Sequence, residues 1–221
     1  MKYFSQEFIR FFHELERNNS KDWFDNNRKT YETQVKEPFS RFVSELIIAI
    51  SQFDDSINKD PKNAIFRINR DIRFSKDKTP YNTEVKAAFV KDGRKSRYPG
   101  YYLAIGADKI YVGGGLYGIE KDDLIAIRSH IAKNTTEFNS LLTDKNFKAH
   151  YGEILGEQNK RIPIEYKELA IKLPVIANKQ FYYMAELKAS DFLAQENLPE
   201  TIIHHFKVGH KLNAFLSQVM L

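Results

Sequence analysis

Apolar residues recur every three or four positions through the first 50 residues of the chain, which is the spacing of amphipathic helices. The pattern predicts a first helix over residues 5–17, with Ser5 as its N-cap. A second helix follows Ser20 and ends before Pro38, because proline has no amide hydrogen to continue the helical hydrogen bonds. Pro38 suits the first turn of a third helix. That helix has the most regular repeat in the sequence, formed by Phe39, Phe42, Val43, Leu46, Ile47 and Ile50.

The apolar period changes to two in the middle of the chain, as in half-buried strands. Residues 84–91 and residues 101–105 both alternate in this way, and residues 109–112 continue the pattern. The turn at residues 106–109 indicates a hairpin. We therefore expect an antiparallel sheet, which the glycines at 113–115 would end. The alternating core positions are Val85, Ala87, Phe89, Tyr101, Leu103 and Ile105.

The last hundred residues predict further helices and one late strand. A helix begins near Lys121, and a shorter one covers residues 135–142. Glycines and prolines break any regular pattern in residues 145–174. A strand over residues 179–187 and an amphipathic helix over residues 199–220 complete the chain. The sequence thus predicts a single α+β domain over residues 1–221, with a central antiparallel sheet packed by N-terminal helices and a C-terminal helix.

Composition narrows the class of protein. The aromatic fraction of 14% and the mean hydropathy of -0.52 are those of a folded globular chain rather than a disordered one. No apolar run approaches the roughly 18–20 residues of a membrane span. Charged residues interrupt residues 1–16, where a signal peptide would need an apolar core. Zero cysteines exclude thiol catalysis and agree with a cytoplasmic location.

The positive charge of the chain is concentrated in one segment. Residues 66–98 hold ten Lys or Arg against four acids, a net charge of +6, whereas the whole chain carries +5. Anionic partners are the ones that such a segment attracts. The candidate partners are therefore a phosphate-bearing small molecule or nucleic acid. No cofactor and no membrane contact is indicated, and the oligomeric state stays open.

Residues 66–74 alternate as an extended strand would. Phe66, Ile68, Ile72 and Phe74 then share one face with Arg70, which is the exception among core residues. A guanidinium in such a place must pair with a carboxylate or bind an anionic ligand, because burying it alone costs several kcal/mol. The two alternatives for Arg70 are about equally weighted.

The opposite face of this segment and the turn after it carry more charge. Arg67 and Arg73 flank Asp71, and a turn built on Asp77 and Pro80 follows. Arginine forks and mobile lysines suit phosphate or carboxylate, but a solvated face with local ion pairs explains the pattern equally well. The rings of Tyr81, Tyr98, Tyr101 and Tyr102 suit base stacking, although packing explains each of them better. The candidate ligand-binding residues are Arg67, Arg70, Arg73, Lys76, Lys78 and Tyr81.

Two other features carry weaker signals. Residues 113–118 lack the spacing of nucleotide-binding loops, so a tight turn or bulge is favoured over an anion nest. The six histidines show no metal-ligand spacing, and we expect no metal site. His204, His205 and His210 favour surface or helix-end positions.

The central segment is also similar to a known family. Residues 66–81, together with Asn18-Asn19, Trp23-Phe24, residues 99–102 and residues 113–117, resemble a bacterial conserved-hypothetical family, domain of unknown function 2461. The resemblance covers nearly the whole chain. One departure is Asn82, where the family pattern has Lys. The resemblance implies one α+β domain and a shared motif, and it implies no catalytic residue.

Three functional hypotheses follow from the sequence. The first and preferred one is an anion-binding domain that uses the basic strand and turn. The second is an enzyme for a small anionic substrate, with Asp71 or Asp77 as acid or base. The third is an internal ion-pair motif that has no ligand.

Overall fold

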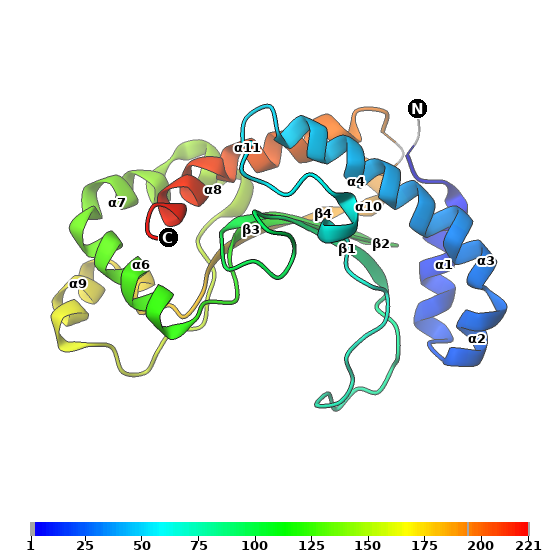
Figure 1. Cartoon of the computed structure of the whole chain (residues 1–221), viewed down its shortest axis with the longest axis horizontal. Coiled ribbons are helices and arrows are strands. Elements are labelled where there is room, and N and C mark those ends of the chain that lie inside the picture. The colour runs from blue at the N-terminus through cyan, green and yellow to red at the C-terminus, as the bar shows by residue number, and fades with distance from the viewer. Residues whose placement is uncertain (1–2, 194, 221) are drawn as a thin grey trace.

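A four-stranded antiparallel sheet organises the fold, with its strands side by side in chain order (Figure 1). The computed structural model describes residues 3–193 and 195–220. The strands are β1 (Glu84–Phe89), β2 (Gly100–Gly106), β3 (Lys109–Leu116) and β4 (Phe181–Lys188). The predicted α+β class and antiparallel sheet are confirmed. The predicted hairpin between β2 and β3 is also present, with Ile105 opposite Ile110.

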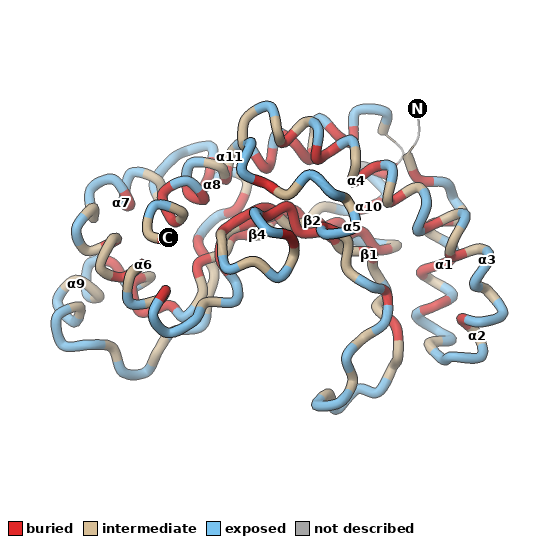
Figure 2. The backbone as a smooth tube through the Cα atoms, in the orientation of Figure 1, coloured by how far each residue is buried: buried red, intermediate tan, exposed pale blue. Residues whose placement is uncertain are grey.

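Helices cover one face of the sheet. In Figure 1, α4 (Glu37–Ile50) and α11 (Leu198–Ser217) lie above the strands, and α1 (Gln6–Arg17) packs beside them. The apolar alternation of the strands explains this arrangement, because every second residue joins one core with α1 and α4. Figure 2 shows the buried residues gathered in the strands and along the helix sides turned toward them. The core residues from the first three strands are Val85, Ala87, Phe89, Tyr101, Leu103, Ile105, Ile110 and Val112.

The region between Ser20 and Pro38 differs from the single helix that we predicted. It forms α2 (Lys21–Asn26), α3 (Arg28–Thr30) and the π-helical turn η1 (Tyr31–Lys36). Ser20 caps α2 through the amide of Trp23, as predicted. Pro38 lies in the first turn of α4, where its missing amide hydrogen is not needed. The wide π turn directly precedes the proline, so the chain bends without leaving the helical region.

A second group of buried residues joins the far ends of β3 and β4 to the C-terminal half of α11. Gly209 lets α11 approach β4 closely, since a Cβ atom there would lie 2.1 Å from the hydroxyl oxygen of Tyr183. Residues 145–174, which showed no regular pattern, contain short helical pieces that complete this group. The helices of this half, with the short ones elsewhere, are α5 (Pro61–Ala64), α6 (Lys121–Lys133), α7 (Thr135–Thr143), α8 (Lys145–Tyr151), η2 (Ile164–Tyr166), α9 (Lys167–Lys172), η3 (Pro174–Ala177) and α10 (Ala189–Phe192).

Arg128 is a buried cation that holds α6 against the chain before β4. Its Nε donates to the carbonyl oxygen of Ile176 at 3.0 Å, and its Nη2 donates to those of Ala177 at 3.3 Å and Asn178 at 3.1 Å. Burial lowers the pKa of Arg128. These carbonyls end η3, so the guanidinium caps that turn in place of water.

Three other local predictions are also wrong. Residues 66–74 do not form a strand, and Phe74 is 96% exposed rather than in the core. The glycines at 113–115 do not end the sheet, because β3 continues through them to Leu116. His205 is buried, with 8% of its surface exposed, because α8 packs against its side of α11. Periodicity alone does not reveal these features, since each depends on a partner far away in sequence.

The buried His205 predicts a specific acid sensitivity. Burial, together with the neighbouring His150 and His204, lowers the pKa of His205 from 6.5 to about 4. A histidine kept neutral by folding contributes stability that is fully present above pH 6.5 and is lost as the pH falls toward 4. We expect His205→Gln to remove about 1 to 3 kcal/mol of this pH dependence. Urea unfolding of both proteins at pH 7 and pH 4.5 measures the difference.

The matched control is His204→Gln, because His204 is the exposed neighbour on the same helix. It should leave most of the pH dependence in place. Equal pH dependence in the wild type and in His205→Gln would contradict the assignment.

Candidate functional site

The charged segment of residues 66–82 forms a hairpin that projects from the edge of the sheet near β1 (Figure 1). Its two limbs are joined by hydrogen bonds from the amide of Arg70 to the carbonyl of Pro80 and from the amide of Asn82 to the carbonyl of Ile68, at 2.9 and 2.8 Å. Beyond these bonds the limbs separate, since Pro80 has no amide hydrogen to extend the ladder. The residues from Asp71 to Thr79 therefore face solvent on both sides of the loop.

Tyr81 anchors the base of the hairpin to the N-terminal helices. Its ring stacks on Phe24 with the centroids 4.0 Å apart, and its side chain is buried. Asn19 accepts from the backbone amide of Tyr81 at 3.1 Å and donates to its carbonyl at 2.9 Å. Tyr81 thus lies in the core, away from the other five residues that the sequence proposed for ligand binding.

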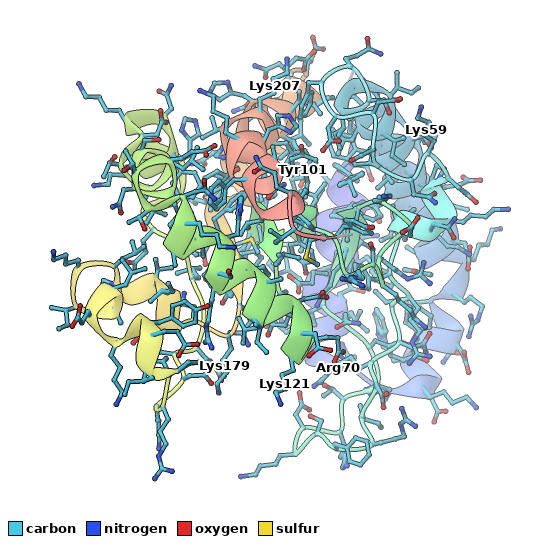
Figure 3. All side chains as sticks on the ribbon, turned by 60° about the vertical axis from the view of Figure 1, so that its left-hand side comes forward. Lys59, Arg70, Tyr101, Lys121, Lys179 and Lys207 are labelled. Carbon is cyan, nitrogen blue, oxygen red and sulfur yellow. The ribbon has the colours of Figure 1, made fainter. Side chains whose placement is uncertain are left out.

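Arg70 is held within the hairpin by Asp77 and Thr79. Its Nη1 contacts the Asp77 carboxylate at 2.5 Å, the Thr79 carbonyl at 3.2 Å and the Thr79 hydroxyl. Its side chain is 25% exposed (labelled in Figure 3). The backbone amide of Thr79 and then the Arg70 guanidinium lower the pKa of Asp77 to about 2. This geometry is the internal ion pair, one of the two alternatives for Arg70.

Two further cations of the hairpin also have partners nearby. Arg73 forms a two-point contact with Asp71, at 2.9 and 2.7 Å, and this contact lowers the pKa of Asp71 to about 2. The Lys78 ammonium donates to the carbonyl of Ile72 at 2.9 Å. Because both Asp71 and Asp77 remain ionised well below neutral pH, they are weak bases and poor proton donors.

Arg67 and Lys76 differ from the other cations of this segment. Both are exposed, and neither has an ion pair or side-chain hydrogen bond to the described residues of the chain. They remain able to meet an anion without first breaking an internal contact. Ligand binding by any of these residues stays a prediction.

A hollow of about 860 Å³ lies beside the base of the hairpin, on the face of the sheet away from α4 and α11. No helix of the described chain lies across this face in Figure 1. We call it the sheet hollow. Phe66, residues 94–98 and residues 117–120 form its walls. Its floor is formed by Ala88, Tyr102, Gly115, Tyr182 and Met184.

The glycines of β3 make the hollow deep enough to reach the backbone of the sheet. Tyr102 on β2 lies opposite Gly113, and Gly115 lies between Gly100 and Tyr182 in the next row. Gly115 has a φ of 98°, a conformation that side chains rarely adopt, and a Cβ atom there would lie 2.3 Å from the carbonyl of Phe181. Gly114 and Gly115 thus line the hollow, and the glycine run does not end the sheet.

The wall at residues 94–98 brings three cations to the hollow. Arg94 donates through Nη1 to the carbonyls of Lys62 and Asn63, at 2.9 and 3.3 Å, which fixes the guanidinium in place. Arg97 pairs with Asp123, a buried acid at the start of α6. Lys95 is exposed and has no ion pair within residues 3–193 and 195–220. Lys91 lies over the Tyr98 ring at 4.3 Å.

Sequence reasoning did not identify the hollow as a unit. It noted the charge of residues 91–98 and the rings of Tyr98 and Tyr102, but it named no residue there as a site. The alternation of residues 179–187 could have placed Tyr182 and Met184 on the face opposite to the core. Nothing in the sequence indicated that this face would be left without a covering helix.

Other polar groups of the chain fit a structural role better. The Tyr101 hydroxyl donates to Asp54 at 2.8 Å and contacts the Nδ1 atom of His210 at 2.7 Å, which ties β2 to α11 on the covered side. Among the described residues, one group has metal-ligand spacing, formed by His13, Glu16 and Asp108. Its two acids are exposed, and a single histidine with surface carboxylates is a weak ligand set.

The part of the chain that matches a known family contains both the hairpin and the hollow. The model of one family, described as conserved hypothetical protein DUF2461, matches residues 7–215. The chain belongs to this family. No curated protein and no solved structure matches it. The function of this DUF2461 protein therefore has to be inferred from its own geometry.

Substitution of Asp77 directly tests the ion pair that holds Arg70 in the hairpin. Asp77→Asn keeps the size of the side chain but removes the charge that Arg70 contacts. We expect trypsin to cleave within residues 66–82 at least about threefold faster, while the thermal midpoint changes little, because the pair lies on a projecting loop. Limited proteolysis with mass spectrometry measures the rate.

Asp55→Asn is the control, since it removes the exposed partner of Lys59 elsewhere on the surface. Cleavage of the hairpin should be unchanged in that variant. An Asp77→Asn protein that is cut no faster than the wild type would show that the Arg70–Asp77 ion pair does not order the hairpin.

Proposed function

We propose that this protein binds a phosphate-bearing ligand on the uncovered face of its sheet, in the sheet hollow and along the basic wall beside it. The single observation that carries the proposal is the hollow itself, where Arg94, Lys95 and Arg97 border about 860 Å³ of space on a sheet face that no described helix covers. Ligand sites are concave and combine apolar surface with a few polar groups. This hollow has that composition.

The chemistry of the wall favours an anion. Arg94 uses only Nη1 to hold the backbone carbonyls, so its Nε and Nη2 remain without a hydrogen-bond partner in the described chain. An arginine fixed in this way presents its remaining donors at little entropic cost. Lys95 adds a mobile charge, and Arg67 adds another at the base of the hairpin. Phosphate oxygens match such donors.

Only some of the hairpin residues that the sequence predicted for ligand binding are part of this proposal. Arg67 and Lys76 are the cations that we propose to meet the ligand, whereas Arg70 and Tyr81 hold the hairpin in place. Arg73 and Lys78 are already in contact with Asp71 and the Ile72 carbonyl, and the Asp71 carboxylate neutralises the charge of Arg73. The low pKa of Asp71 and of Asp77 gives no support to the alternative of an enzyme with either residue as acid or base.

The cytoplasmic location belongs to the same proposal. Among the described residues, no helix has both the length and the apolar composition needed to cross a bilayer. Zero cysteines are compatible with a reducing compartment.

Isothermal titration calorimetry with inorganic polyphosphate at low salt tests the proposal. We expect binding that weakens as salt rises, because phosphate contacts release counterions. The double variant Arg67→Glu/Lys95→Glu should lose about tenfold or more in affinity, since each change reverses one charge near the ligand.

The matched control is Lys59→Glu/Lys207→Glu, which reverses two exposed lysines outside the hollow (labelled in Figure 3). It should change the affinity less than threefold. No binding at low salt, or an equal loss in both double variants, would refute the proposed site.

A further inference from the structure

The uncovered sheet face carries a group of aromatic rings that anion binding alone does not require. Tyr102 on β2 and Tyr182 on β4 point to this face, because their strand neighbours Tyr101 and Tyr183 lie in the buried cores on the other side. Both are half-buried and line the sheet hollow. Tyr98 and Tyr117 stand at its rim, and Tyr117 is 73% exposed.

The spacing of these rings leaves part of the sheet between them, at Gly115, without a covering side chain. Tyr102 and Tyr182 lie on either side of β3, because Tyr102 pairs with Gly113 and Tyr182 pairs with Gly115, two residues further along. Their Cα atoms are therefore about 10–12 Å apart. Between them on β3, a Cβ atom at Gly115 would have only backbone atoms as its nearest neighbours, whereas the Met184 sulfur lies over Gly113, 2.8 Å from where a Cβ atom would be. A flat ring can therefore lie above Gly115 beside Tyr182, and a ring that stacks on Tyr102 also contacts the Met184 thioether. Tyr117 lies edge-on to Tyr182, with centroids 5.3 Å apart, and borders the same gap.

From this arrangement we infer that the ligand is a single strand of nucleic acid, whose bases stack on Tyr102 and Tyr182 while its phosphates meet the basic wall. The inference rests on the proposed function and names the ligand class of the same site. An antiparallel sheet with aromatic side chains on an open face stacks splayed bases in this manner. Stacking on aromatic rings contributes about 1–3 kcal/mol per base and tolerates any sequence.

Charge distinguishes this occupant from a second copy of the chain. Two acids near the hollow are paired, since Glu84 contacts Lys86 at 2.7 Å and Asp123 contacts Arg97, and Glu120 in the wall is the one lining acid, with no ion pair in the described chain. Lys95, Arg67 and Lys76 have no such partner in the described chain. Two copies placed face to face would bring these cations together, which is unfavourable, whereas a polyanion neutralises them.

A duplex fits the same surface less well. In a base-paired helix the bases stack on each other, so their faces are not available to a protein ring. The hollow has rings at its floor and cations at its wall, so a bound strand needs its bases turned inward and its phosphates turned toward residues 94–98. Only an unpaired strand presents its bases and its phosphates to one surface in this way.

Fluorescence anisotropy with labelled oligonucleotides tests the inference. The probes are dT5, dT10 and dT20, the RNA U10 and a 20-base-pair duplex, with inorganic polyphosphate as the competitor. We expect dT10 and U10 to bind at least about tenfold more tightly than the duplex. Tyr102→Leu and Tyr182→Leu should each weaken single-strand binding about tenfold, but should leave the affinity for polyphosphate unchanged.

Tyr102→Phe and Tyr182→Phe are the controls, because phenylalanine keeps the stacking surface and loses only the hydroxyl. Each should bind the single strand within about threefold of the wild type. Thermal unfolding of all four variants confirms that they are folded. Loss of affinity in the Phe variants equal to that in the Leu variants would overturn the stacking role.

The outcomes separate the two proposals. Polyphosphate binding with no preference for single strands, and with no effect of the Leu variants, would refute the inference and leave the proposed function standing. No binding of either probe would refute both. A dimer in light scattering that Tyr102→Leu disrupts would show that a second copy covers the face, which also overturns the inference.

Discussion

The alternation of apolar residues in the strands puts one face of the sheet against α4 and α11, and the rest of the molecule depends on this one-sided burial. The helices pack their apolar residues against that face alone. The side chains on the other face therefore contact solvent, which favours small or amphipathic residues there. In the described strands this other face carries Ala88, Tyr102, Gly115, Tyr182 and Met184 around the hollow, and the ion pairs Lys86–Glu84 and Lys109–Glu186 elsewhere. The hollow is thus a consequence of how the core is built, and the basic wall of residues 94–98 lies in the connection between β1 and β2.

The hairpin and the hollow use positive charge in different ways. In the hairpin, Asp71, Asp77 and backbone carbonyls engage most of the cations, and Tyr81 with Asn19 fixes the base of the loop to the N-terminal helices. Its charges mainly shape the loop. At the hollow, Arg94 is fixed by carbonyls and keeps free donors, and Lys95 is unpaired in the described chain. The anion-binding surface that we propose is therefore centred at the hollow, beside residues 66–82, rather than in the hairpin itself.

How much of this was predictable depends on whether a feature is local or long-range. The helix repeat of α4, the cap at Ser5 and the alternation of β1 and β2 depend on residues close in sequence, and each was predicted. The strand expected at residues 66–74 was wrong, because alternation is necessary for a strand but a neighbouring strand must also supply hydrogen bonds. His205 was misplaced because its burial depends on α8, more than 50 residues away. The hollow could not be derived, since no pattern states which face of a sheet stays open.

Hydrogen–deuterium exchange with and without inorganic polyphosphate tests most directly the central claim that the uncovered sheet face is the binding surface. Exchange reports protection for each peptide separately, so it distinguishes the two faces through the segments around them. We expect slower exchange in residues 91–98 and 113–120 when polyphosphate is bound, with α4 and α11 unchanged. Protection confined to α4 and α11, or to the far helices α7 and α9, would contradict it.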